Sequence, residues 1–132
     1  NEGMPFLGIC VGLQVLFEAS EEAPGIEGLS IFKGRNVRFT EGKIPQIGWN
    51  KIKTTEADSV LKDDYFYFVN SFHAVPEDAS IVSAIAEYGR PFTAAVQRNN
   101  IAATQFHPEK SGAAGQEVLR RWVESFGIET EK

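Results

Sequence analysis

The sequence predicts a single α/β domain, because segments typical of strands alternate with two segments typical of helices. An apolar run enters a Gly-x-Cys-x-Gly motif at residues 8–12, and an amphipathic segment follows it. Residues 65–69 are aromatic or β-branched throughout, which is typical of a strand. Near the C-terminus, an apolar stripe recurs at helical spacing. The strand-rich middle therefore lies between helical segments.

In the N-terminal half, we expect a buried strand at residues 4–9 and a helix at 11–20 that ends at the Ala-Pro-Gly sequence after it. Residues 35–40 and 48–53 are expected to form strands on either side of a turn with the sequence Glu-Gly-Lys. A short helical turn is expected at 57–62.

In the C-terminal half, we expect a strand at residues 65–69 and a hairpin formed by 81–88 and 92–98. A strand at 101–106 follows an Asn-Asn turn. The last helix is expected to begin at 112 or 113 and to end at 126, with Gly127 as its C-cap. The apolar stripe of this helix consists of Val118, Leu119, Trp122, Val123 and Phe126.

Length, charge and cysteine content narrow the class of protein. The 132 residues suit one domain spanning 1–132, and the formal net charge of −5 argues against nucleic acid or an anionic membrane as the main partner. One cysteine cannot form an internal disulfide, which favours a reducing compartment, so we expect a cytoplasmic protein. No apolar run reaches the roughly 18 residues of a membrane span.

Cys10 is the strongest candidate for a nucleophile. A strand that ends in a sharp Gly-x-Cys-x-Gly turn before a helix is the arrangement of a nucleophile elbow. We expect Gly8 and Gly12 to keep Cβ atoms out of this turn, and the N-terminus of the helix to favour the thiolate. The structural alternative for a lone cysteine is a small buried hydrophobic residue.

A nucleophilic cysteine needs a base, and the base needs a group that orients it. His107 comes just after a predicted strand, and Glu109 follows two residues later. Because Pro108 holds His107 extended, the Glu109 carboxylate can reach one imidazole nitrogen while the other faces the thiol. If the strands before Cys10 and His107 are parallel neighbours, both residues lie at the carboxyl edge of one sheet.

Structural alternatives exist for the histidines as well. His107 could be a surface residue at a strand end, and His-x-Glu spacing alone is common. The combination with Gly-x-Cys-x-Gly is much more specific. His73 is expected to be structural or on the surface. The chain has no metal-ligand spacing, phosphate loop or dinucleotide fingerprint, so we expect neither metal nor cofactor.

These motifs resemble those of the class I, triad-type glutamine amidotransferases. In that family Gly-x-Cys-x-Gly-x-Gln holds the nucleophile, matched here by residues 8–14, and a late His-Pro-Glu supplies the base and its orienting carboxylate, matched by 107–109. Three further segments are similar to those of the glutaminase subunits of imidazole glycerol phosphate synthases: 45–50, 67–72 and 105–111. The resemblance covers nearly the whole chain and implies a flavodoxin-like sheet flanked by helices.

The resemblance also implies a reaction. Cys10 would attack the side-chain amide of glutamine and release ammonia, and water would then hydrolyse the thioester. His107 would act as base and acid, and Glu109 would hold the imidazole in the useful tautomer. The ammonia would pass to a partner cyclase subunit, which makes imidazole glycerol phosphate in histidine biosynthesis.

Substrate-binding roles follow from the resemblance by position. The backbone N–H of Val11 would be an oxyanion donor. Gln14 would contact the substrate glutamine, with an exposed helix residue as the alternative reading. Ser71 and Phe72 would hold the α-amino and carboxylate groups of the glutamine through their backbone.

Two positions are implied in the partner interface. Trp49 and Lys110 match residues that face the cyclase near the route of the ammonia. The structural alternatives are a core aromatic residue for Trp49 and a solvated charge for Lys110.

The chain departs from the family pattern in two ways. Asn70 and Phe72 replace the usual His and Tyr, which should matter little because the roles there run mainly through the backbone. Family members also carry several strands and helices before the nucleophile strand, including a glycine-rich oxyanion strand, whereas this chain opens on Asn1. We therefore expect that residues 1–132 are the C-terminal two-thirds of the domain and that they are poorly active or unstable alone.

Three other functions fit the sequence. One is a class I amidotransferase with another ammonia acceptor, and the synthase that it binds would distinguish it. Another is a cysteine hydrolase or peptidase on a similar fold, in which labelling of Cys10 by a glutamine-mimicking electrophile would not be blocked by glutamine. The last is a binding module whose triad is idle.

Overall fold

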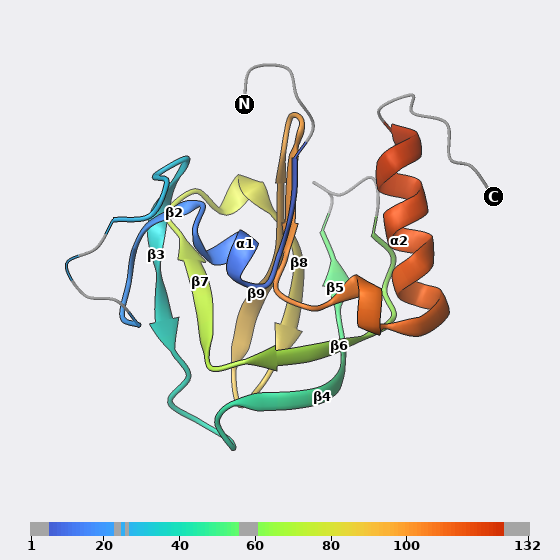
Figure 1. The fold of residues 1–132 in the computed structure, drawn as a ribbon. Coiled ribbons are helices and arrows are strands. Elements are labelled where there is room, and N and C mark those ends of the chain that lie inside the picture. The colour runs from blue at the N-terminus through green and yellow to red at the C-terminus, as the bar shows by residue number, and fades with distance from the viewer. Residues whose placement is uncertain (1–5, 23–24, 26, 56–60, 126–132) are drawn as a thin grey trace.

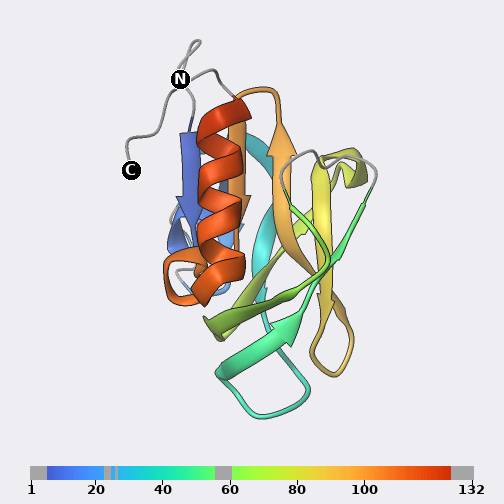
Figure 2. The same cartoon turned by 90° about the vertical axis from the view of Figure 1, so that its right-hand side faces the viewer.

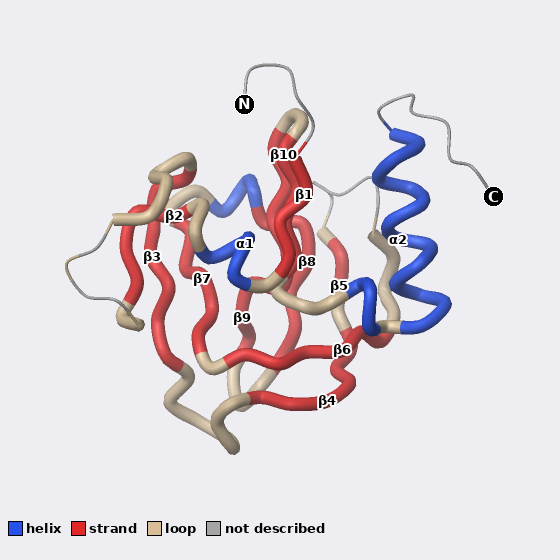
Figure 3. Tube along the Cα trace, in the orientation of Figure 1, coloured by secondary structure: helices blue, strands red, loops and turns tan. Residues whose placement is uncertain are grey.

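The computed structural model describes residues 6–22, 25, 27–55 and 61–125. Strands form three sheets, and helices pack at their sides (Figures 1 and 3). The largest sheet has the strand order β1 (Phe6–Ile9), β10 (Ile101–Thr104), β9 (Pro91–Arg98), β8 (Val82–Glu87) and β5 (Lys53–Thr54). The predicted α/β class is confirmed.

The remaining strands form two smaller sheets. One has the order β2 (Phe17–Ser20), β3 (Phe32–Arg38) and β7 (Phe72–Pro76), and the other pairs β4 (Gln46–Lys51) with β6 (Tyr65–Asn70). The helical elements are α1 (Val11–Gln14), α2 (Gly112–Ser125) and the 3₁₀ turns η1 (Ala79–Ile81) and η2 (Pro108–Lys110). The predicted hairpin is present as the antiparallel pair β8 and β9.

The pairing of β1 with β10 places the functional motifs together. These strands are parallel, with Ile9 opposite Thr104, so both end at the same edge of the sheet. Cys10 directly follows β1, and the segment 105–107 directly follows β10. The conditional prediction that these two strands are parallel neighbours is confirmed.

Aromatic packing anchors the chain just after β10. The Phe106 side chain is fully buried, and its ring stacks on Phe66 of β6 with centroids 4.3 Å apart. Phe68 of the same strand meets Phe106 edge-on at 5.6 Å. Burial of each such ring contributes about 1.5–3 kcal/mol, so the aromatic strand predicted at 65–69 holds the segment that carries His107.

A second apolar cluster lies beneath α1. It joins the buried side chains of Leu13, Leu16 and Phe17 to those of Phe32 on β3 and Ala103 on β10. Because Leu13 belongs to this cluster, the short helix after Cys10 is held against the sheet by burial of its apolar side.

The predicted helix at 11–20 is wrong beyond its first turn. The helix ends at Gln14, and residues 17–20 form β2, which pairs in parallel with β3. The Leu16 carbonyl accepts hydrogen bonds from Ile31 and Phe32 instead of continuing a helix. The apolar spacing suits both structures, and the distant strand β3 supplies the pairing that decides between them.

Helix α2 packs against a face of the five-stranded sheet and lies in front of that sheet in the view of Figure 2. Val118 is buried in the core, and Trp122 packs against the same cluster. A Cβ atom on Gly115 would lie 1.8 Å from the carbonyl oxygen of Pro108, so glycine is required where α2 contacts η2. The predicted helix is confirmed; Phe126, its proposed cap Gly127 and most of the turn expected at 57–62 lie outside the described residues. None of the described helices is long and apolar enough to cross a bilayer.

Candidate active site

Cys10 occupies a strained turn between β1 and α1. Its φ of 56° and ψ of −105° lie in a region that non-glycine residues rarely adopt. The turn is held by the Cys10 N–H, which donates to the Thr104 carbonyl at 2.7 Å, and by the Cys10 carbonyl, which accepts from Leu13 and Gln14. Such strain costs about 1–3 kcal/mol and clusters at functional sites. The arrangement is that of a nucleophile elbow.

The two glycines of the motif differ in what they do. A Cβ atom on Gly8 would lie 2.7 Å from the backbone oxygen of Gly12, so the turn leaves no room for a side chain there. A Cβ atom on Gly12 would meet nothing within 4 Å. The expectation that both glycines keep Cβ atoms out of the turn therefore holds for Gly8 alone.

The environment of the Cys10 thiol favours its neutral form. Burial raises the pKa of Cys10, and the backbone N–H of Val11 and the side chain of Gln105 only partly offset this effect. The negative charges of Glu109 and Glu22 raise the pKa further. The N–H of Val11 at the start of α1 lowers the pKa of Cys10, as a position at a helix N-terminus predicts, but desolvation by burial outweighs this effect and the pKa is raised overall.

The backbone of His107 is clamped to β6. Its N–H donates to the Tyr67 carbonyl at 2.9 Å, and its carbonyl accepts from the Ser111 hydroxyl at 2.6 Å. The Tyr67 N–H in turn donates to the Ser111 hydroxyl oxygen at 2.9 Å. Pro108 is buried and begins the 3₁₀ turn η2, which directs the chain back toward His107.

His107 and Glu109 interact as the motif predicts. The Nδ1 atom of His107 lies 2.7 Å from Oε2 of Glu109, across Pro108. Burial alone would raise the pKa of Glu109, but the hydrogen bond from His107, with the backbone and the charges of His107 and Lys110, lowers it. The carboxylate is therefore ionised at neutral pH and suited to orient an imidazole or stabilise an imidazolium.

Cys10 and His107 lie at the same edge of the sheet without a direct hydrogen bond. The partners of the Cys10 sulfur among the described residues are the Val69 carbonyl at 3.8 Å and Nε2 of Gln105 at 3.6 Å. The expected contact between the thiol and the second imidazole nitrogen is not among them. Catalytic hydrogen bonds commonly tighten only when substrate is bound.

The expected substrate-binding residues surround the elbow. Nε2 of Gln14 donates to the Phe72 carbonyl at 3.3 Å and to Oε1 of Gln105 at 3.2 Å. The Ser71 carbonyl accepts from the Phe39 N–H at 3.0 Å. Val11 is 61% exposed, and its N–H lies beside the sulfur that it helps to stabilise. Gln14 is half-buried and bonded, so the alternative of a merely exposed helix residue is wrong.

Gln105 is a site residue that the sequence reasoning did not single out. Its side chain is fully buried and lies between Gln14 and the Cys10 sulfur. Its position two residues before His107 is the one signal that could have identified it, since a polar residue there must lie at the same strand end.

The two positions expected at an interface are both on the surface. Trp49 of β4 is 56% exposed and meets Tyr67 edge-on, so the alternative of a core aromatic residue is wrong. Ile47 and Tyr65 of the antiparallel pair of β4 and β6 are also exposed. Lys110 is exposed at the end of η2, beside the His107 segment.

His73 is structural, as expected. It is buried on β7, with its ring 4.7 Å from that of Phe39 and 6.0 Å from that of Phe92. Burial lowers the pKa of His73, and the charge of Arg90 adds to this effect while the Ala74 backbone and Glu21 oppose it. Its Nδ1 atom is buried without a hydrogen-bond partner.

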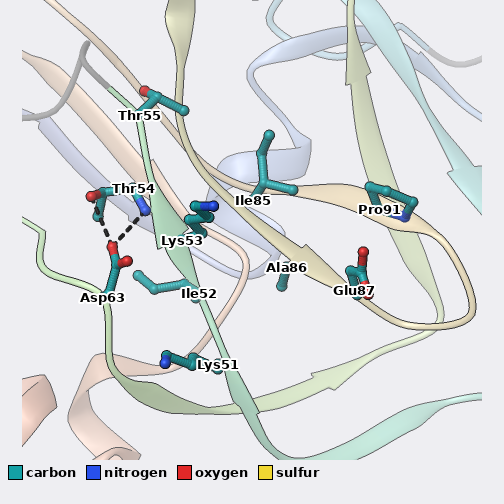
Figure 4. Close-up of a pocket in the computed structure, with 10 residues that line it drawn as sticks. All are labelled: Lys51, Ile52, Lys53, Thr54, Thr55, Asp63, Ile85, Ala86, Glu87 and Pro91. Carbon is teal, nitrogen blue, oxygen red and sulfur yellow. Dashed lines mark hydrogen bonds between the residues drawn. The ribbon is translucent and has the colours of Figure 1, made fainter.

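The most voluminous of the cavities described lies away from this chemistry. It measures about 830 Å³ and is formed by β5, β8 and the chain beside them, with Lys51, Lys53 and Asp63 at its rim (Figure 4). A smaller cavity of about 190 Å³ adjoins the elbow and is lined in part by Val11 and Gln14. Among the described residues, no group of His, Cys, Asp and Glu is arranged to hold a metal ion.

Comparison with known proteins agrees with the geometry of the site. Residues 1–125 match the family model of the class-I glutamine amidotransferases. Subunit HisH of imidazole glycerol phosphate synthase from Methanothermobacter thermautotrophicus is 50% identical over 127 residues, which are 93% of this chain and 64% of the relative. The same subunit from Pyrococcus furiosus is 49% identical over 127 residues, covering 92% of this chain and 66% of the relative. The chain thus spans about two-thirds of the length of these relatives.

Solved structures show the same fold at low sequence identity. A crystal structure of a glutamine amidotransferase superposes with a TM-score of 0.69 at 19% identity, over 96% of this chain and 64% of that one. A glutamine amidotransferase from Thermotoga maritima gives a TM-score of 0.59 at 18% identity, over 96% of this chain and 48% of that one. With the family model matching nearly the whole chain around this Cys-His-Glu arrangement, the chain belongs to the class-I glutamine amidotransferase family.

Proposed function

We propose that this chain belongs to the glutaminase subunit of imidazole glycerol phosphate synthase, which hydrolyses glutamine to glutamate and ammonia. The proposal is supported by 44–50% identity to curated subunits of that synthase over more than nine-tenths of the chain. The observation that carries it is the strained Cys10 elbow at the end of β1, with the bonded His107 and Glu109 pair at the end of the parallel neighbour β10.

The proposed mechanism starts from a protonated thiol. Because the pKa of Cys10 is raised, attack on the glutamine amide needs a base, and Nε2 of His107 is available because Nδ1 is engaged by Glu109. The sulfur adds to the amide carbon while the imidazole takes the thiol proton. The imidazolium then protonates the amide nitrogen, which leaves as ammonia when the C–N bond breaks. The same imidazole nitrogen takes a proton from the water that attacks the thioester and returns it to the sulfur as the C–S bond breaks.

Neighbouring groups would bind the substrate and its transition state. The Val11 N–H, which lies beside the sulfur, would donate to the oxyanion. The backbone of Ser71 and Phe72, near the start of β7, would hold the α-amino and carboxylate groups of glutamine. Gln14, which bonds to the Phe72 carbonyl, would help shape that end of the substrate site.

The partner in this proposal is a cyclase subunit in the cytoplasm. Trp49, Ile47 and Tyr65 present exposed apolar surface on the antiparallel pair of β4 and β6, and Lys110 is exposed beside the His107 segment. Exposed aromatic residues are enriched at protein interfaces relative to the rest of the surface. Docking of the cyclase there would place the entrance for ammonia next to the thiol.

Glutamate release from glutamine tests the proposal. We expect the complete glutaminase subunit to release glutamate faster when the cyclase and a ligand of its active site are added, and Cys10→Ala to abolish this release. The two histidines provide a matched pair, in which His107→Asn abolishes release and His73→Phe retains it.

Two outcomes would contradict the proposal. Stimulation by a synthase other than the cyclase would indicate another ammonia acceptor. No release by the folded complex, with Cys10 still alkylated by electrophiles that do not resemble glutamine, would indicate a different cysteine hydrolase.

A further inference from the structure

A chain of two side-chain amides joins the substrate-side strand β7 to the thiol. It runs from the Phe72 carbonyl to Nε2 of Gln14 at 3.3 Å, and from that nitrogen to Oε1 of Gln105 at 3.2 Å. It ends where Nε2 of Gln105 meets the Cys10 sulfur at 3.6 Å. The proposed mechanism assigns no role to Gln105.

The orientation of both amides follows from the first link. A backbone carbonyl can only accept a hydrogen bond, so Gln14 must turn its amino group toward Phe72. The second hydrogen of that amino group faces Gln105, which must then present its oxygen. The amino group of Gln105 is thereby directed at the sulfur. A flip of either amide would place two donors or two acceptors face to face.

Gln105 is held firmly enough to act as a fixed donor. Its side chain is fully buried, and its backbone N–H donates to the Ala94 carbonyl of β9 at 2.7 Å. Phe106, also fully buried, follows it, and His107 comes next. One short segment after β10 therefore carries both a donor for the sulfur and the proposed base.

The two contacts of the sulfur favour opposite protonation states. The Val69 carbonyl accepts from the thiol and would repel a thiolate. The amino group of Gln105 stabilises a thiolate, because a donor near a sulfur interacts more strongly with its charged form. When the proton leaves, the contact to Val69 is lost and the contact to Gln105 strengthens, which holds the sulfur at the Gln105 side.

We propose that Gln105 is a positioning residue that holds and stabilises the Cys10 thiolate, with its donor end directed at the sulfur by Gln14. The role of Gln14 is then to orient Gln105 as well as to contact β7. This inference rests on the proposed nucleophilic role of Cys10, but its test does not require turnover.

The test is the pH dependence of alkylation by iodoacetamide. Cys10 is the single cysteine among residues 1–132, and its alkylation rate, followed on the peptide that carries it, reports its thiolate directly. In Gln105→Met, which keeps a similar volume without a donor, we expect the alkylation midpoint to move to higher pH. The rate at pH 7 should fall about tenfold, as expected for loss of one hydrogen bond to a charged group.

Two further variants make the test specific. Gln14→Met leaves Gln105 free to turn its oxygen to the sulfur, so we expect a smaller shift in the same direction. Gln97→Met removes an amide from β9 in the same sheet and should leave the pH profile unchanged. A merely structural role would lower the urea midpoint of Gln105→Met without moving the alkylation profile.

The outcomes separate this inference from the proposed function. An unchanged profile in folded Gln105→Met, or in folded Gln14→Met if the first variant does not fold, overturns the role of Gln105. A shifted profile, when the complete subunit with native Gln105 releases no glutamate in the presence of the cyclase, supports the role of Gln105 and overturns the glutaminase proposal. A shifted profile with a parallel fall in kcat supports both.

Discussion

Replacement of Gly8 by alanine should break the elbow, whereas the same replacement at Gly12 should not. A Cβ atom on Gly8 would lie 2.7 Å from the oxygen and 2.8 Å from the carbon of the Gly12 carbonyl, and 3.2 Å from Cε2 of Phe6. The two nearest atoms belong to the backbone, which cannot rotate away as a side chain would. A Cβ atom on Gly12 would meet nothing within 4 Å.

The size of the effect follows from these distances. In Gly8→Ala, the new methyl carbon would lie about 0.7 Å closer to the Gly12 oxygen than the ordinary contact distance of 3.4 Å, so β1 and α1 must separate locally. Overpacking of this kind costs about 1–3 kcal/mol, and a loss of 2 kcal/mol lowers the ratio of folded to unfolded protein roughly 30-fold. Alanine at position 12 is a better helix former than glycine by about 1 kcal/mol, so Gly12→Ala should be neutral or slightly stabilising.

Urea unfolding followed by tryptophan fluorescence measures the difference, since Trp49 and Trp122 lie in different parts of the fold. We expect Gly8→Ala to lower the free energy of unfolding by about 2 kcal/mol relative to Gly12→Ala, and to slow alkylation of Cys10 because the elbow moves. Equal stabilities within about 0.5 kcal/mol, or a larger loss in Gly12→Ala, would show that the close approach of Gly8 to the Gly12 backbone does not constrain the elbow.

Three further predictions concern single side chains. His73 is buried with a lowered pKa, so its contribution to stability is present above the unfolded pKa near 6.5 and is lost as pH falls through the folded pKa. We expect His73→Phe to flatten this pH dependence of the free energy of unfolding by about 1.4 kcal/mol per unit of difference between the folded and unfolded pKa, measured in urea titrations at pH 5 and 7.5. Glu109→Gln should reduce kcat for glutamate release by about 10²- to 10⁴-fold with an unchanged urea midpoint, because it removes the carboxylate that orients His107. A reduction of kcat by less than about tenfold would contradict that role. Trp49→Ala should change the free energy of unfolding by less than about 1 kcal/mol yet weaken cyclase binding in calorimetry, with the exposed Lys33→Ala as the neutral control.

Local sequence signals predicted the elements that one stretch of chain can specify. The aromatic run of β6, the hairpin of β8 and β9, and helix α2 all follow from period, propensity and turn residues. The contact between His107 and Glu109 follows from their spacing across Pro108. Such features depend on neighbours within a few residues.

Local signals failed where pairing with a segment distant in the sequence decides whether residues form a helix or a strand. The apolar residues after Cys10 are spaced as in a helix, but pairing with β3 converts residues 17–20 into a strand. The raised pKa of Cys10 has the same origin, because burial by segments distant in the sequence outweighs the stabilisation of the thiolate by the N–H of the short helix α1. Both outcomes depend on groups that are remote in sequence.

Motifs readable in the sequence were enough to identify the residues proposed to carry the chemistry: a cysteine in a Gly-x-Cys-x-Gly turn and a histidine with its carboxylate in His-Pro-Glu. The tertiary structure alone decided how they meet. Parallel pairing of β1 with β10 brings Cys10 beside a segment 95 residues away in the chain, and with it the buried amide of Gln105. Burial and hydrogen-bond polarity are properties of these assembled neighbours, so the sequence could place Gln105 at the same strand end but could not show that its amino group faces the sulfur.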